Sequence, residues 1–357
     1  MQGIGLEIES ILKLISENQN ISDLHLSTGD SVAFRYNWEI IKKEELWKIS
    51  NENMEIILKQ LFNNNPQRFE KFLWDKEADF AYLSKDNTAY RVNAFLKTGR
   101  IGIVMRKIEN KPKKLWEIMF QDTADIIKNQ ILGSYKGLFL ITWPTWAGKS
   151  TSIVAMLEEI NKNFAWHIIT IEDPIEYVFE QKKSIISQRE IMHDTRSFDN
   201  AIKSALREDP DIIFVGEIRE QKTAEAVLDL AETGHLVFST LHTNGAVSTI
   251  NRFLWFFPNE MQGWILERLA DCLAGILSQA LVKRKDGNWR VAMFELMLNN
   301  NAVRNNLKKR EIEQLYNILE TSSQNGMITM KQYAKKLIER GIIDQNEIQK
   351  LTKNRFF

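Results

Sequence analysis

The stretch that most constrains this chain is Gly137–Leu157, which reads GLFLITWPTWAGKSTSIVAML. It predicts a buried strand over Leu138–Thr142, a short loop, and a helix that begins within Gly148–Thr151. A helix start presents unpaired backbone N–H groups and the positive end of the helix dipole, so it favours an anion. This order of strand, loop and helix is typical of a phosphate-binding P-loop.

Each position of such a loop has a chemical task. Lys149 is expected to reach the β- and γ-phosphates, and Ser150 to place its hydroxyl on Mg²⁺. The predicted nucleotide-binding residues are Trp143, Pro144, Thr145, Trp146, Ala147, Gly148, Lys149, Ser150 and Thr151. However, the strict pattern G-x-x-x-x-G-K-[ST] fails at its first position, Trp143, and Trp146 also lies inside the loop. Two indoles leave no obvious room for backbone amides to approach a phosphate.

Composition excludes several classes of protein. Lys and Arg number 47, equal to Asp and Glu, so no general field attracts nucleic acid or anionic lipid. The single cysteine, Cys272, excludes a disulfide framework and a four-cysteine zinc site. No apolar run is as long as a membrane span, and Met1–Gly5 lacks the features of a signal peptide. We therefore expect a cytoplasmic protein of two or three domains.

Residues 1–110 are expected to form a small α/β domain, bounded by the basic, proline-containing joint Lys111–Lys114. Its pattern predicts helices over Leu6–Glu17 and Asn53–Phe62, and strands over Ser22–Ser27, Val32–Tyr36, Glu39–Ile41, Ala78–Leu83, Thr88–Phe95 and Gly102–Arg106.

A second domain is expected over residues 115–357. Predicted strands at Leu138–Thr142, His167–Ile171, Asp211–Gly216 and Leu236–Leu241 alternate with predicted helices at Lys149–Asn161, Phe198–Arg207 and Thr223–Glu232. This alternation predicts a doubly wound, mostly parallel sheet. From about Met261 the chain is expected to be mostly helical, ending in helices at Met330–Arg340 and Gln345–Lys353.

Acidic residues follow two of the predicted strands. ITIEDPIEY (Ile169–Tyr177) ends in Glu176, and DPDIIFVGEIR (Asp209–Arg219) contains Glu217. Because the carboxyl ends of parallel strands meet at one edge of the sheet, both stretches are expected near the P-loop. There they would hold Mg²⁺ and orient an attacking water. The simpler alternative is that Glu176 and Glu217 are solvated acids at strand ends.

His235 and His242 bracket the strand in TGHLVFSTLHTN, without the spacing of a zinc site. One of them is expected to sense the phosphate state beside Glu217, and the alternative is a histidine satisfied by local hydrogen bonds. Arg91 and Arg106 flank the last strands of the first domain. Surface arginines are mostly just solvated, but in an oligomeric ATPase they often stabilise the transferring phosphoryl group.

Several further segments carry a family resemblance. They are SDLHLS (Ser22–Ser27), RVNAF (Arg91–Phe95), SALREDPDIIFVGEIR, AETGHLVFSTLHTN, LSQALVKR (Leu277–Arg284), AVRNN (Ala302–Asn306) and NGMITM. Together with ITIEDPIEY and the P-loop, they make the chain similar to the secretion ATPases of type IV pilus and type II secretion systems. The likeness covers nearly the whole chain and is greatest to the pilus-retraction branch. Asn306 departs from that branch, whose corresponding signature ends in leucine.

The resemblance implies a PAS-like N-terminal domain joined to a RecA-like ATPase domain, with ATP between them, in a ring-shaped homo-hexamer. It assigns ATP phosphates and Mg²⁺ to Lys149 and Ser150, and it makes Glu217 the Walker B acid. Glu176 would act on the attacking water, His242 would sense phosphate, and Arg91 and Arg106 would neutralise charge. It further implies an inner-membrane platform protein of the pilus as partner, only indirect membrane contact, and no nucleic acid.

ATP-driven pilus retraction is therefore the expected function. The alternatives are a pilus-assembly or type II secretion ATPase, and a pseudo-ATPase ring subunit if Trp143 and Trp146 are real. A nucleic-acid translocase finds no support in the neutral charge.

The tryptophans have an alternative explanation. The family would place glycine at positions 143 and 146, usually also at 38 and 289, and often at 166, and this chain has tryptophan at all five. Glycine is scarce, at 16 of 357 residues, and tryptophan abundant, at 10. We hypothesise that these tryptophans stand at UGA codons that the organism reads as glycine. For Trp47, Trp74, Trp116, Trp255 and Trp264 the resemblance offers no clear glycine.

Overall fold

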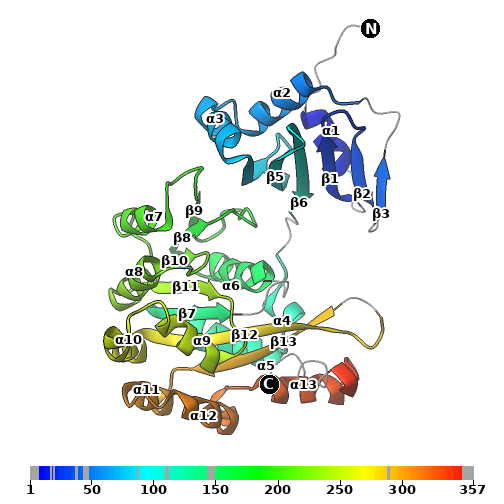
Figure 1. Ribbon diagram of the computed structural model, residues 1–357. Coiled ribbons are helices and arrows are strands. Elements are labelled where there is room, and N and C mark those ends of the chain that lie inside the picture. The colour runs from blue at the N-terminus through cyan, green and yellow to red at the C-terminus, as the bar shows by residue number, and fades with distance from the viewer. Residues whose placement is uncertain are drawn as a thin grey trace. The chain divides into compact units, whose positions relative to one another are not determined.

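The computed structural model describes residues 8–16, 18, 21–36, 39–42, 48–86, 88–108, 112–142, 149–287 and 290–347, without the side chains of Leu14 and Lys149. The chain forms two compact units (Figure 1). The first comprises Met1–Lys111 together with the short segment Asp173–Val178. The second comprises Pro112–Glu172 and Phe179–Phe357.

The first unit is built on an antiparallel sheet of order β3-β2-β1-β6-β5-β4. Its elements are α1 (Ile8–Ser16), β1 (Ile21–Ser27), β2 (Ala33–Tyr36), β3 (Glu39–Lys42), α2 (Asn51–Leu61), α3 (Pro66–Asp75), β4 (Glu77–Leu83), β5 (Ala89–Lys97) and β6 (Arg100–Lys107). Every strand expected from the sequence is present. Buried and more exposed residues alternate along β1 and β5, so one face of the sheet packs on a core. This core includes Leu24, Val92 and Phe34.

The second unit is built on a seven-stranded sheet of order β13-β12-β7-β11-β10-β8-β9. Its first part contains α4 (Leu115–Ile118), α5 (Gln121–Ile127), η1 (Lys128–Leu132), β7 (Gly137–Thr142), α6 (Lys149–Asn163), β8 (His167–Glu172), β9 (Ile185–Glu190), α7 (Phe198–Ala205), β10 (Ile212–Val215), α8 (Gln221–Glu232) and β11 (Leu236–Leu241). Strands β7, β11, β10, β8 and β9 run parallel, which confirms the doubly wound sheet. All residues of β7, β10 and β11 are buried, as strands covered on both faces require.

The second half of this unit contains α9 (Ala246–Leu254), α10 (Asn259–Cys272), β12 (Leu273–Lys283), β13 (Arg290–Leu298), α11 (Asn301–Lys308), η2 (Ile312–Gln314), α12 (Leu315–Thr321), η3 (Ser323–Asn325) and α13 (Met330–Glu339). The expectation of a mostly helical chain from about Met261 is corrected here, because β12 and β13 are long strands. Figure 1 shows them as the extended pair beside β7. A buried strand and a buried helix both read as a continuous apolar run, so the pattern LAGILSQALVK did not distinguish them.

Smaller differences have similar causes. The sequence pattern missed α3, α4, α5, α9 and the edge strand β9, and it extended the Phe198–Arg207 helix two residues beyond α7. The helix α13 confirms the prediction at Met330–Arg340, whereas most of the predicted Gln345–Lys353 helix lies outside the described residues. No helix in the described parts of the chain is long and apolar enough to cross a membrane.

Cys272, the chain's single cysteine, ends α10. Its side chain is 6% exposed and belongs to the core of the second unit. Burial disfavours the thiolate and raises the pKa of the Cys272 thiol to about 12. The thiol is therefore protonated and unreactive at neutral pH.

Candidate functional site

The sheet of the second unit brings three loops to one edge. Strands β7 and β11 pair in parallel from Gly137 with Leu236 to Thr142 with Leu241, and β11 pairs in parallel with β10. Their carboxyl ends therefore lie side by side. The chain enters the predicted phosphate-binding segment where β7 ends, Glu217 follows β10 and His242 follows β11, so all three segments begin at the edge where α/β sheets bind ligands.

The turn that carries Glu217 is fixed to its neighbouring strand by backbone groups. The Ile218 amide donates to the Thr240 carbonyl at 3.0 Å, and the Thr240 hydroxyl donates to the Gly216 carbonyl at 2.6 Å. These bonds hold the residues on both sides of Glu217 against β11. The carboxylate is thus held at the sheet edge on a rigid element rather than on a free loop.

Glu217 is paired on both carboxylate oxygens. His242 Nε2 lies 3.1 Å from Glu217 Oε2, and Arg219 forms an ion pair with Glu217 Oε1. An ionised carboxylate only accepts hydrogen bonds, so Nε2 of His242 carries the proton and donates it. The pKa of Glu217 is lowered to about 2. The hydrogen bond from His242 is the main cause, and the hydrogen bond from Arg219 is the next cause that lowers it. The side chain is 14% exposed and ionised at neutral pH.

This shift of pKa predicts a pH dependence of stability. The ordinary pKa of Glu217 is 4.5 and the folded value about 2, so its contribution is complete above pH 4.5 and is lost as pH falls toward 2. We expect the difference in unfolding free energy between wild type and Glu217→Gln to stay constant above pH 4.5 and to shrink below it. Denaturant titrations at several pH values measure this difference. A difference that already shrinks near pH 6 contradicts the lowered pKa.

The other predicted catalytic residues lie in the first unit. Arg91 on β5 pairs with Arg106 on β6 across the sheet, and Arg91 Nη1 lies 3.3 Å from Glu176 Oε1. Glu176 belongs to Asp173–Val178, the segment that packs with this unit. Arg106 Nε donates to Asp23 Oδ1 at 2.7 Å. The structure thus joins Arg91 to Glu176, and Glu217 to His242.

The remaining predicted residues surround the loop itself. Positions 143–148 lie outside the described residues, as does the side chain of Lys149. Helix α6 begins at Lys149, and Ser150 and Thr151 are half-buried in its first turn. His235 lies at the opposite end of β11, where its Nδ1 contacts the Leu230 carbonyl at 3.0 Å, so its surroundings are those of a structural histidine.

The donor set suits Mg²⁺ bound together with a phosphate. In the described residues, no group of three or more His, Cys, Asp or Glu side chains could hold a metal ion alone. Mg²⁺ is commonly bound by one or two protein oxygens plus substrate phosphates and water. The ionised Glu217 and the hydroxyl of Ser150 are oxygen ligands of this kind. Sequence reasoning missed Arg219, although it closes the same DPDIIFVGEIR stretch two residues after Glu217.

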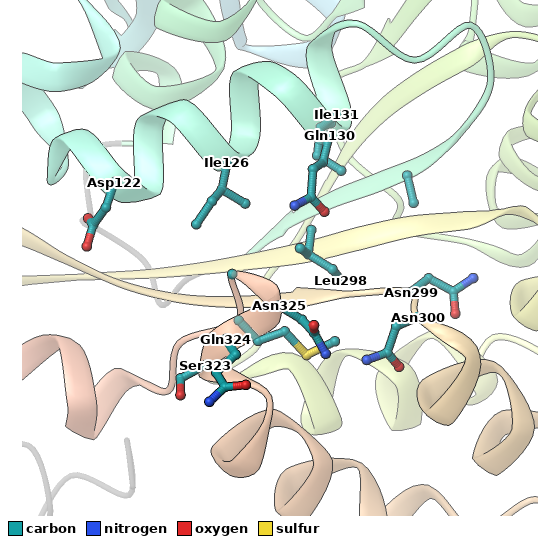
Figure 2. A pocket seen from close by; sticks show the side chains of 13 residues that line it. Asp122, Ile126, Gln130, Ile131, Leu298, Asn299, Asn300, Ser323, Gln324 and Asn325 are labelled. Atoms are coloured by element: carbon teal, nitrogen blue, oxygen red, sulfur yellow. The ribbon is translucent and has the colours of Figure 1, made fainter.

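A separate pocket of about 740 Å³ lies elsewhere in the second unit (Figure 2). It is lined by residues of α5, η1, the end of β13 and η3, among them Ile126, Gln130, Asn299 and Gln324. Asn299 donates to the Ala270 and Leu273 carbonyls at 2.9 and 2.8 Å. Of the predicted site residues that the structure describes, Ser150, Thr151, Glu176, Glu217, His242, Arg91 and Arg106, none lines this pocket.

Comparison with known proteins identifies the class. Residues 8–353 match the profile of type II/IV secretion system proteins, and the chain belongs to this family. It is 37% identical over 347 residues to the type IV pilus retraction ATPase PilT of Pseudomonas aeruginosa, covering 96% of this chain and 97% of that protein. It is 39% identical over 352 residues to a twitching motility protein of Neisseria gonorrhoeae, covering 97% and 91%.

A solved structure extends the likeness to three dimensions. The crystal structure of the pilus retraction motor PilT with bound ADP superimposes with a TM-score of 0.85 at 36% identity, covering 96% of each chain. The match confirms the expected fold class, α/β with a PAS-like domain followed by a RecA-like one.

Proposed function

We propose that this protein hydrolyses ATP to drive type IV pilus retraction, and that it works as a ring-shaped homo-hexamer. The observation that carries the proposal is the ionised Glu217, held by His242 and Arg219 at the sheet edge where α6 begins. The relatives named as a retraction ATPase and a twitching motility protein, which match nearly full length, support the pilus assignment.

In the proposed mechanism, basic residues and backbone amides bind the phosphates, and acidic residues and a hydroxyl bind Mg²⁺ and orient water. Lys149 and the backbone amides at the start of α6 bind the phosphates, and Ser150 and Glu217 hold Mg²⁺. When bound, Mg²⁺ neutralises charge on the phosphates and polarises the transferring group. His242 keeps Glu217 ionised and can respond to the γ-phosphate through the same Nε2–H. Glu176 orients the attacking water, and Arg91 and Arg106 stabilise the developing negative charge.

The loop can perform this task only if its backbone approaches the phosphates. We therefore propose that positions 143 and 146 are glycine in the natural protein, read from UGA codons. The composition supports this reading, because the chain has only 16 glycines in 357 residues beside 10 tryptophans.

The first experiment measures the tryptic peptide Gly137–Lys149 from the native organism by mass spectrometry, together with ATP turnover of the same preparation. The expected result is a peptide whose mass corresponds to glycine instead of tryptophan at both positions, from a preparation that hydrolyses ATP. Tryptophan at both positions and no turnover overturn the proposal and favour a pseudo-ATPase subunit.

Retraction and assembly are separated in the cell. Deletion of the gene is expected to leave excess pili that do not retract, because a retraction motor removes pilin from the filament. Loss of all pili would instead identify an assembly or secretion ATPase. The motor is proposed to act at the inner face of the cytoplasmic membrane through a platform protein at the pilus base. Co-purification of that protein from detergent extracts tests this contact.

A further inference from the structure

A cluster of buried hydroxyls surrounds the last residue before the P-loop. Thr142 Oγ1 lies 2.8 Å from Ser278 Oγ on β12 and 3.3 Å from Thr249 Oγ1 on α9. Thr249 also donates to the Gly245 carbonyl at 2.8 Å and lies 2.7 Å from the hydroxyl of Thr243. Thr142, Ser278 and Thr249 are fully buried, and within the described part of the chain their hydroxyls are paired with one another, with Thr243 and with the backbone.

A second buried bond lies beyond the loop. Ser152, in the first turns of α6, donates its hydroxyl to Gln279 Oε1 at 2.6 Å. Both side chains are buried. Gln279 is the residue directly after Ser278 on β12. The bond therefore ties the helix that begins at Lys149 to the same strand that holds Thr142.

The two anchors lie on opposite faces of the sheet. Successive side chains of a strand alternate between its faces, so Ser278 and Gln279 point in opposite directions. Ser278 is in register with Thr142 on β7 and shares its face with Thr249 of α9, while Gln279 reaches α6 on the other face. Two adjacent residues of β12 thus hold the chain before and after the loop.

The same region continues to the C-terminal helices. Ser278 is paired with Glu295 of β13, and Glu295 accepts from the amide of Ala246 at 2.8 Å and of Met330 at 3.3 Å. These amides begin α9 and α13. Gly245, with φ of 93°, brings the chain close to this carboxylate, because a Cβ there would meet Glu295 Oε1 at 3.3 Å.

We propose that Ser278 and Gln279 are positioning residues that fix the two ends of the nucleotide-binding loop, Ser278 through Thr142 and Gln279 through Ser152. The inference rests on the proposed ATPase function and assigns a role to the LSQALVKR segment (Leu277–Arg284) that the catalytic scheme leaves unused. Phosphate-binding amides act best when their geometry is set before the ligand arrives. The β12 anchors supply that preorganisation and tie the loop to β13, α9 and α13.

The test compares variants that each remove one anchor. Thr142→Val takes from the buried Ser278 hydroxyl the partner it has at Thr142, and the thermal midpoint reports the cost in stability. Thr142→Val keeps the shape of the side chain and removes its hydroxyl, and Thr142→Ser restores the hydroxyl. The double variant Ser152→Ala/Gln279→Leu removes both partners of the second bond, which is nearly neutral for stability when the replacements are apolar. Each is made in the chain that carries the residues found at positions 143 and 146 by mass spectrometry.

The readouts are the dissociation constant for fluorescent ADP, KM and kcat for ATP, and the thermal midpoint. Loss of either anchor is expected to weaken ADP binding about tenfold, the equivalent of one buried hydrogen bond. Thr142→Ser keeps the hydroxyl, so its dissociation constant for ADP is expected to lie within about twofold of the wild-type value. The matched control is Ser184→Ala, because Ser184 is buried and donates to the Phe164 carbonyl at 2.8 Å, away from the loop.

The outcomes separate this inference from the function on which it rests. ADP affinity that falls in Thr142→Val and in the double variant, but not in Ser184→Ala at a comparable thermal midpoint, supports positioning. Affinity that follows the thermal midpoint in all variants shows a merely structural role and overturns the inference. A wild-type chain that binds no nucleotide overturns the proposed function instead.

Discussion

A recombinant chain with glycine at both positions 143 and 146 is expected to hydrolyse ATP at least about 100-fold faster than the chain with tryptophan there. Each bulky side chain blocks the approach of backbone amides to the phosphates. The loss of a single well-placed donor to a developing negative charge already costs about 100- to 1,000-fold in rate. Turnover is measured with both chains expressed in a host that reads UGA as a stop codon, from synthetic genes.

The matched control changes an indole outside the loop. Trp74, on α3 of the first unit, is 86% exposed, so Trp74→Gly removes the same side chain far along the sequence from the P-loop. This variant is expected to keep the turnover of its parent chain and to lose at most about 1 kcal/mol of stability as a helix glycine. Equal turnover of the tryptophan and glycine loops would contradict the recoding hypothesis.

Glu217→Gln is expected to lower kcat for ATP by about 100- to 10,000-fold, the range for loss of a positioned catalytic group. The change keeps the shape of the side chain and removes the charge that His242 and Arg219 hold in place. ADP binding is expected to persist, because the proposed phosphate contacts come from Lys149 and the start of α6. Steady-state turnover and an ADP titration measure the two effects.

Glu232→Gln serves as its control. Glu232 pairs with Arg268 at 2.6 Å at the end of α8, so the substitution also removes a charge from an ion-paired acid of the second unit. It is expected to leave kcat unchanged. If Glu217→Gln behaves like Glu232→Gln, then Glu217 is a structural ion-paired acid without a catalytic role.

The sheet centre was predictable because its strands are short, apolar and separated by helices with clear polar faces. β7, β8, β10 and β11 were all expected at their positions. β12 and β13 were not, because LAGILSQALVK is buried along most of its length and shows no alternation that separates a strand from a buried helix. Tertiary pairing with β7 decides the conformation, and that pairing is not visible in local sequence.

In the candidate site too, contacts between neighbouring strand ends could be predicted from local sequence, whereas contacts that depend on tertiary packing could not. Glu217 and His242 each follow a recognisable strand, and the rule for parallel sheets was enough to expect them near one another. The bond between Thr142 and Ser278 joins residues 136 positions apart on strands whose register no local pattern fixes. The link between Arg91 and Glu176 likewise depends on a short segment that packs with the first unit.

The burial of Cys272 makes the chain convenient for spectroscopy. Because its thiol is protonated and inaccessible, a maleimide dye will leave the wild-type chain unlabelled while it reacts with a cysteine introduced on the surface. Pairs of such labels, one in each compact unit, would let single-molecule fluorescence follow the distance between the units through a catalytic cycle. No native cysteine has to be removed first.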